Sequence, residues 1–113
     1  MTVNERVSGD VTVLDVVGNI TVGDGAHMLR DKVRSLLQQG NKQLLVNLAD
    51  VSYMDSGGLG EMVQAYATVT KQGGALKLVN ATKRLQDLLV ITRLSTVFDS
   101  FDDEPTAVNS FAK

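Results

Sequence analysis

A single serine, Ser56, lies in the stretch of the sequence best suited to chemistry. It follows Asp55 and precedes three glycines within four residues, at Gly57, Gly58 and Gly60. Glycine carries no side chain, so the backbone beside this serine is predicted to be open to a partner. A hydroxyl presented in this way can cap a helix, attack a substrate as a nucleophile, or accept a phosphate.

The simplest role for Ser56 is structural. An apolar run at 43–48 precedes it and an amphipathic segment at 57–72 follows, so a strand is expected to end and a helix to begin near the serine. Serine is a favoured N-cap residue, because its oxygen accepts a hydrogen bond from a free backbone N–H at the start of a helix. From these residues alone, a cap and a functional role both remain open.

Catalysis by Ser56 lacks the residues that it requires. A nucleophile elbow needs glycine two residues before the serine, where this chain has Met54, and His27 is the only histidine available as a base. No lysine follows the glycines, which excludes a P-loop, and the aspartates are scattered in a way that favours turns and caps over a metal site. The protein is therefore expected not to be an enzyme and to hold no metal or cofactor.

Phosphorylation fits the surroundings of Ser56 better. A phosphate adds about −1.5 to −2 charges. The N-terminus of a helix favours such an anion by about 0.3–1 kcal/mol, so the fold is expected to survive the modification. A partner docked over the serine is disfavoured by the new charge, and Asp55 already supplies one negative charge beside it. The stretch therefore predicts a switch that acts through binding.

The composition indicates one soluble globular domain spanning residues 1–113. Of these residues 43% are hydrophobic and 21% charged, and the net charge of −2 provides no basic field for nucleic acid. The chain has no cysteine, no run near the ~20 apolar residues that a membrane span needs, and no signal-peptide pattern at residues 1–5. We expect a cytoplasmic protein that binds neither nucleic acid nor membrane.

The hydrophobic pattern predicts an α/β fold. Strands that alternate with helices become parallel neighbours, and an initial hairpin makes the sheet mixed, with about four or five strands and about four helices. The expected strands are 2–8, 11–17, 43–48, 75–79 and an edge segment at 97–101, and the expected helices are 26–39, 57–72, 82–92 and one that starts at 103–105.

Several local features refine this prediction. The run at 43–48 is apolar throughout, as is typical of a strand buried on both faces. Asp24 is the expected N-cap of the first helix. Val90 and Ile91 lie off the apolar stripe of their helix, which leaves core packing and a dimer contact both open. If strands 11–17 and 43–48 are neighbours, the loop at 19–25 meets the serine motif at one edge of the sheet.

The stretch from Asp55 to Gly60 resembles the Asp-Ser-(Ser/Thr/Ala/Gly)-Gly-Leu-Gly signature of the anti-sigma factor antagonists, the stand-alone STAS domains. The resemblance covers nearly the whole chain and implies a STAS-like fold. Its other positions are the Gly18 turn, Leu45-Val46-Asn47-Leu48, Val51, Tyr53-Met54, the Gly73-Gly74 turn and Leu78-Val79-Asn80.

The resemblance implies a partner-switching regulator. Ser56 is then the residue phosphorylated by a serine kinase that is also an anti-sigma factor. The dephosphorylated protein binds this kinase and so frees a sigma factor, and a PP2C-type phosphatase resets the switch. ATP belongs to the kinase, and the protein is expected to be a monomer or weak dimer. The expected partner surface comprises Thr21, Gly23, Asp24, Met54, Asp55, Gly57, Gly58 and Leu59.

The chain departs from many family members at three positions. Gly57 replaces a serine or threonine, and Asn19 and Thr21 stand where acidic residues are common. An alternative function is a STAS interaction module without phosphorylation, such as a transporter accessory or a subunit of a sensory assembly. In the leading hypothesis, Gly57 and Gly58 provide clearance for the kinase.

Overall fold

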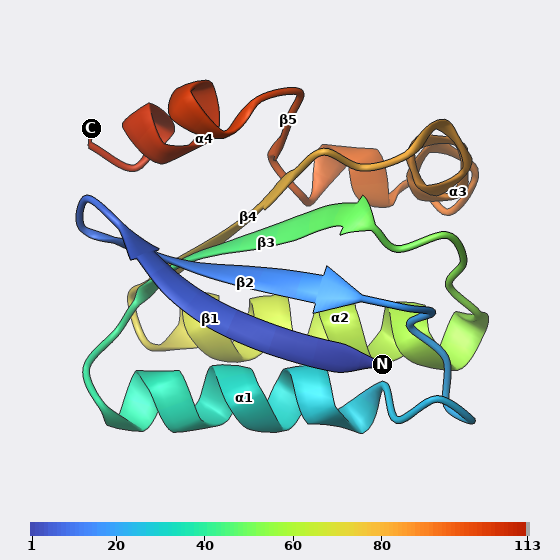
Figure 1. Ribbon diagram of the computed structural model, residues 1–113, viewed down its shortest axis with the longest axis horizontal. Coiled ribbons are helices and arrows are strands. Elements are labelled where there is room, and N and C mark those ends of the chain that lie inside the picture. Colours follow the sequence, from blue (N-terminus) through green and yellow to red (C-terminus); the bar gives the residue numbers. More distant parts are fainter. Residues whose placement is uncertain (113) are drawn as a thin grey trace.

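The computed structural model in Figure 1 describes residues 1–112. Five strands and four α-helices follow the order predicted from the sequence, with a short 3₁₀-helix before the last strand. The elements are β1 Thr2–Ser8, β2 Val11–Val17, α1 His27–Gln38, β3 Gln43–Asp50, α2 Ser56–Lys71, β4 Ala75–Val79, α3 Lys83–Ile91, the 3₁₀-helix Leu94–Thr96, β5 Ser100–Phe101 and α4 Glu104–Ser110.

The five strands form one sheet in the order β1-β2-β3-β4-β5, so every neighbour in the sheet is also the next strand in the chain. β1 and β2 form an antiparallel hairpin that turns at Gly9, whose φ of 62° suits glycine. The other strand pairs are parallel, which confirms the predicted mixed sheet. β3 extends to Asp50 because that residue still pairs with Val17 of β2.

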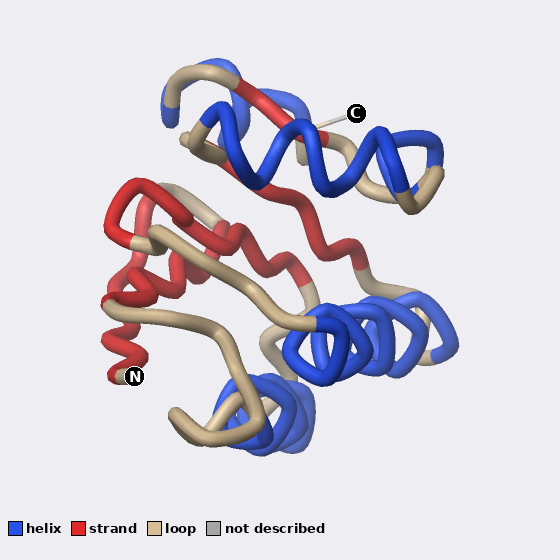
Figure 2. The backbone as a smooth tube through the Cα atoms, turned by 90° about the vertical axis from the view of Figure 1, so that its right-hand side faces the viewer, coloured by secondary structure: helices blue, strands red, loops and turns tan. Residues whose placement is uncertain are grey.

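Helices cover both faces of the sheet. α1 and α2 lie side by side on one face and α4 lies on the other, as Figures 1 and 2 show from two directions. β3 contributes to an apolar cluster on each face. Leu44 and Val46 belong to the cluster beneath α1 and α2, whereas Leu45 packs with Ala107 of α4 and with Phe111, the residue that follows α4. The prediction that this strand is buried on both faces is confirmed.

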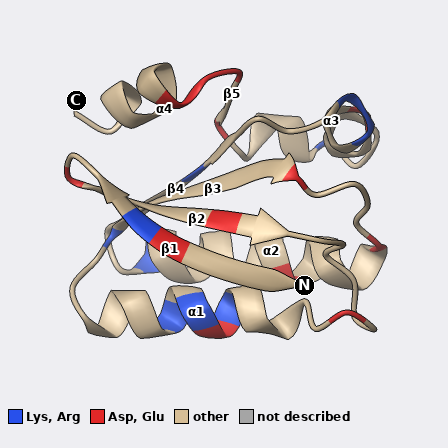
Figure 3. Cartoon of the chain, viewed as in Figure 1, with Lys and Arg blue, Asp and Glu red and all other residues tan. Residues whose placement is uncertain are grey.

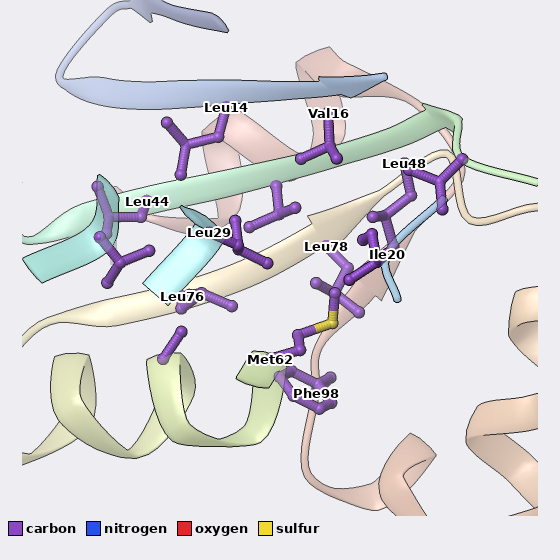
Figure 4. Close-up of a cluster of buried hydrophobic side chains, with 14 of the residues drawn as sticks. Leu14, Val16, Ile20, Leu29, Leu44, Leu48, Met62, Leu76, Leu78 and Phe98 are labelled. Carbon is purple, nitrogen blue, oxygen red and sulfur yellow. The ribbon is translucent and has the colours of Figure 1, made fainter. Parts of the chain in front are cut away.

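The larger core extends to the carboxyl end of the parallel strands. Figure 4 shows Ile20, Leu48, Met62 and Leu78 gathered there, and each of them is essentially inaccessible to solvent. Phe98 belongs to the same cluster and packs edge-to-face against Tyr66, with ring centroids 5.1 Å apart. The loops at this end therefore rest on a packed apolar base.

Two local predictions differ from the structure: the cap of α1 was wrong, and the expected edge strand is present but covers fewer residues. Asp24 does not cap α1: the helix begins after Ala26, and Asp24 instead accepts a hydrogen bond from the Thr21 hydroxyl at 2.6 Å, which stabilises the preceding loop. The edge strand is also shorter than expected. Phe98 lies just after the 3₁₀-helix and is buried in the core. Only Ser100–Phe101 pairs with β4.

The apolar residues at the end of α3 face solvent. Val90 is 63% exposed and Ile91 is 79% exposed, so neither belongs to the core of this chain. A contact with a second copy stays a prediction. Within residues 1–112, no helix combines the length and the apolar character required to cross a membrane.

Polar contacts hold α4 against the sheet at both of its ends. Arg6 of β1 donates to Asp15 at 2.7 Å and to Glu104 at 2.8 Å, which ties the start of α4 to the hairpin. Lys77 donates to the Ser110 carbonyl oxygen at 3.1 Å, near the end of α4. The hydrogen bonds from Arg6 lower the pKa of the Asp15 and Glu104 carboxyls, because they favour the ionised form.

The ion pairs of Arg6 with Asp15 and Glu104 predict a pH-dependent contribution to stability. A carboxyl whose folded-state pKa is lowered stabilises the fold above its unfolded pKa, near 4, and that contribution is lost as the pH falls further. We expect Arg6→Met to lower the free energy of unfolding by about 1 kcal/mol at pH 7, since the groups are partly exposed. The difference from wild type should shrink between pH 5 and about pH 2, as measured by urea unfolding.

Lys83→Met is the matched control for this experiment. It breaks the Lys83–Asp87 pair, whose side chains are 84% and 55% exposed, and should change stability far less than Arg6→Met. An Arg6→Met effect of equal size at both ends of the pH range would contradict the assignment.

Candidate functional site

The loop at 19–25 and the segment at 51–55 meet at the carboxyl edge of the sheet. The Ile20 N–H donates to the Tyr53 carbonyl oxygen at 3.0 Å, and the Asp55 N–H donates to the Ile20 carbonyl oxygen at 3.3 Å. Ile20 and Met54 thereby form a parallel bridge that continues the pairing of β2 and β3 beyond the two strands. The expected meeting of the two loops is confirmed, and Figure 2 faces this end of the molecule.

Asp55, rather than Ser56, caps helix α2. Its backbone is extended, with φ −91° and ψ 177°, and its Oδ1 accepts the Gly58 N–H at 2.6 Å. Its Oδ2 accepts the Val22 N–H at 3.3 Å. The prediction of a serine cap was therefore wrong by one residue, because a carboxylate is an equally favoured cap and makes a charge-assisted bond. The same carboxylate joins the helix to the 19–25 loop.

Ser56 is the first residue of α2, and it is exposed. Within residues 1–112, no hydrogen bond to its hydroxyl is found, so the structure assigns it no part in holding the fold. The charged residues nearby in the chain are Asp24 and Asp55 in the neighbouring loops and Asp50 at the end of β3, and Figure 3 shows red segments at this end of the sheet. The hydroxyl therefore lies free at a helix N-terminus.

Two of the three glycines, Gly57 and Gly58, lie in close contact with the 19–25 loop of the same chain. A β-carbon on Gly58 would lie 1.8 Å from the Ile20 carbonyl oxygen, and one on Gly57 would lie 2.1 Å from Cγ2 of Val22. Only Gly60 has open space at this position. Clearance for a kinase is therefore the wrong explanation for Gly57 and Gly58, which allow the 19–25 loop to lie directly on the first turn of α2.

The expected partner-binding residues divide into two groups. Met54, Gly58, Leu59 and Thr21 are buried, and they support the two loops from beneath. The remaining four are partly or fully exposed, and with Ser56 they form the outer surface; they are Gly23, Asp24, Asp55 and Gly57.

Sequence reasoning missed two exposed apolar residues at this site. Val22 is 68% exposed and lies against Gly57, and Tyr53 is 44% exposed. The signal for Val22 was a β-branched residue in a loop otherwise rich in glycine, and Tyr53 was noted only as part of the family resemblance.

A groove runs between Tyr53 and helix α3. It has a volume of about 520 Å³ and is lined mainly by apolar side chains, including Leu88 and Ile91. Lys83 and Arg84 lie along it, and Lys83 is paired with Asp87 at 2.8 Å. The serine end of the molecule thus offers apolar contacts on both loops, with basic side chains farther out on α3.

His27, the one histidine of the sequence, lies at the start of a different helix from Ser56. His27 is exposed at the start of α1, and no hydrogen bond between it and Ser56 is found in the described chain. Among residues 1–112, no group of three or more His, Asp or Glu side chains is close enough to hold a metal ion.

The Asp55 cap predicts a clear ranking of variants. Asp55→Ala removes the acceptor for both N–H groups and should lower the free energy of unfolding by about 1–2 kcal/mol. Asp55→Asn keeps one acceptor oxygen, but its amide nitrogen cannot accept the second N–H, so it should recover only part of this loss. Ser56→Ala is the control and should stay within about 0.5 kcal/mol of wild type. Urea denaturation measures all three, and a loss in Ser56→Ala equal to that in Asp55→Ala would restore the serine cap.

Gly58 and Gly60 provide a matched pair for the close approach of the loop. Gly58→Ala places a methyl group against the Ile20 backbone and should destabilise the protein by about 3 kcal/mol. Gly60→Ala enters open space inside the same helix and should stabilise it by roughly 0.5–1 kcal/mol. Thermal melts of the two variants should therefore shift in opposite directions, and a tolerated Gly58→Ala would contradict the packing described above.

Comparison with known proteins agrees with this architecture. Residues 2–107 match the STAS domain family. The chain is 45% identical over 86 residues to the anti-sigma-B factor antagonist of Bacillus subtilis, a match that covers 76% of this chain and 77% of that protein.

Solved structures show the same fold at lower identity. The Thermotoga maritima protein TM1081 superposes with a TM-score of 0.90 at 22% identity, covering 98% of this chain and 95% of that one. The phosphorylated form of SpoIIAA, a Bacillus cell fate determinant, has a TM-score of 0.74 at 18% identity, covering 96% and 98%. Together with the family match and the Bacillus subtilis relative, these findings show that the chain belongs to the STAS domain family and, within it, to the non-enzymatic anti-sigma factor antagonists.

Proposed function

We propose that this protein binds an anti-sigma factor that is also a serine kinase, and that phosphorylation of Ser56 ends this binding. The observation that carries the proposal is the position of Ser56: an exposed hydroxyl on the first turn of α2, beside a cap that Asp55 already fills. The similarity of the chain to the anti-sigma-B factor antagonist of Bacillus subtilis supports an anti-sigma factor as the partner.

The dephosphorylated surface suits a protein partner. Val22 and Tyr53 expose apolar groups on the two loops beside Ser56, and the groove along α3 continues the apolar contact to Ile91. A partner seated here shields the serine hydroxyl from water. Occupying the anti-sigma factor in this way releases the sigma factor that it held.

Phosphate transfer reverses the binding. The Ser56 oxygen attacks the γ-phosphorus of ATP held by the kinase, the bond to the β–γ bridging oxygen breaks, and ADP leaves while the serine proton passes to a base on the kinase. The product carries about −1.5 to −2 charges next to Asp55. Keeping a partner docked would then require burying an unpaired anion, which disfavours the complex.

The fold tolerates this charge. The phosphate lies at the N-terminus of α2, a helix of 16 residues, where the helix dipole favours an anion. Because Asp55 already accepts the Gly58 N–H, the phosphate need not replace the cap and can face solvent. A PP2C-type phosphatase restores the binding form, and we place the cycle in the cytoplasm.

Ser56 variants test the proposal with Ser52 as a matched control. Ser52 is also exposed on this end of the molecule, and its hydroxyl donates to Asn19 at 2.8 Å. With the cognate kinase and ATP, wild type and Ser52→Ala should each gain one phosphate, and Ser56→Ala none, as measured by intact mass. Ser56→Asp should keep wild-type stability within about 0.5 kcal/mol and lose kinase binding in calorimetry.

Two results would contradict this proposal. Phosphate retained by Ser56→Ala would move the acceptor to another residue. Kinase binding by Ser56→Asp as tight as that of wild type would remove the switch, and a STAS interaction module without phosphorylation would then explain the protein better.

A further inference from the structure

Val22 occupies the space that a side chain at position 57 would need. Its Cγ2 lies 2.1 Å from the point where a β-carbon on Gly57 would stand, so the two positions cannot both carry side chains in this arrangement. Gly57 directly follows Ser56 in the first turn of α2. The space beside the residue that follows Ser56 is therefore filled by an apolar group from the 19–25 loop.

The loop holds Val22 firmly in this place. The Val22 N–H donates to Asp55 at 3.3 Å, and its carbonyl oxygen accepts the Gly25 N–H at 3.3 Å. On one side of it, the Thr21 hydroxyl donates to Asp24 at 2.6 Å and the Thr21 carbonyl oxygen accepts the Ala26 N–H at 2.9 Å. A β-branched side chain on such a backbone has few rotamers left to lose when a partner covers it.

The position of Val22 is not explained by burial within the fold. The side chain is 68% exposed, so most of its apolar surface gains nothing from the core. Tyr53, in the segment that pairs with this loop, is 44% exposed and carries a largely apolar ring. The two side chains come from the two segments that meet beside Ser56, whose other exposed residues include Ser52 and Asp24.

We propose that Val22 is a contact residue for the anti-sigma factor and that the Val22–Gly57 pair determines which partner is accepted. The inference rests on the function proposed above. The partner would present an uncharged apolar hollow opposite Val22, beside the site where it receives the Ser56 hydroxyl. A protein with a larger residue at 57 and a smaller one at 22 would present its apolar group from the helix, and so would fit a differently shaped hollow.

The first test needs no partner and measures the coupling of the two positions. Gly57→Ala should lower the urea midpoint, because the new methyl group displaces Val22 from its place. Val22→Ala alone should leave the midpoint nearly unchanged. In the double variant the methyl group enters free space, so the midpoint should return toward wild type. Additive effects of the two substitutions would overturn the pairing.

The second test measures affinity for the cognate anti-sigma factor, loaded with a non-hydrolysable ATP analogue so that Ser56 stays unmodified. Val22→Ala and Val22→Thr should each weaken binding about tenfold, the range of a well-buried interface contact. Val22→Thr keeps the shape over Gly57 and changes only the polarity. Val7→Ala is the matched control, since Val7 is a 75% exposed valine on β1, outside both loops, and it should bind as wild type does.

The outcomes separate this inference from the proposed function. If Val22→Ala and Val22→Thr bind as tightly as wild type while Ser56→Asp fails to bind, Val22 is not a contact and the switch stands. If wild type does not bind, or binds no more tightly than Ser56→Asp, the proposed function is wrong and the inference falls with it.

Discussion

The serine end of the molecule depends on two hydrogen bonds accepted by the carboxylate of Asp55. One oxygen accepts the Gly58 N–H and so starts helix α2, while the other accepts the Val22 N–H and so holds the 19–25 loop. A free N–H at a helix start and a free N–H in a loop would each cost energy if they were left without an acceptor. The Asp55 carboxylate accepts both N–H groups, so the hydroxyl of the next residue, Ser56, is not needed as a cap.

The sheet explains why these groups meet. β2 and β3 are parallel neighbours, so the loops that follow them leave from the same edge. The backbone pairing continues through Ile20 and Met54, and both side chains enter the core that lies under the loops. The surface around the serine is therefore supported by packed side chains, as Figure 4 shows for Ile20 and its neighbours. Such support keeps the backbone that carries Ser56 in one position, which lowers the entropy cost of recognition.

In the function that we propose, the switch separates binding from folding. The start of a helix accepts negative charge, so a phosphate on Ser56 would oppose a docked partner without opposing the fold. Contacts elsewhere, such as the ion pairs of Arg6 with Asp15 and Glu104, involve none of the residues of the serine motif. In this proposal, modification of Ser56 itself therefore acts on the partner surface and leaves the fold in place.

The sequence by itself determined the order of the elements, the burial of β3 on both faces and the importance of the Asp-Ser-Gly-Gly stretch. These features depend on periodicity and on residues close together in the chain. Only the tertiary structure decided that Asp55 is the cap, that Gly58 makes room for the Ile20 carbonyl group, and that Val22 rests on Gly57. The sequence shows where the glycines are, but not which atoms lie against them. Those atoms belong to Ile20 and Val22, in a loop distant in the sequence that the parallel pairing of β2 and β3 brings close.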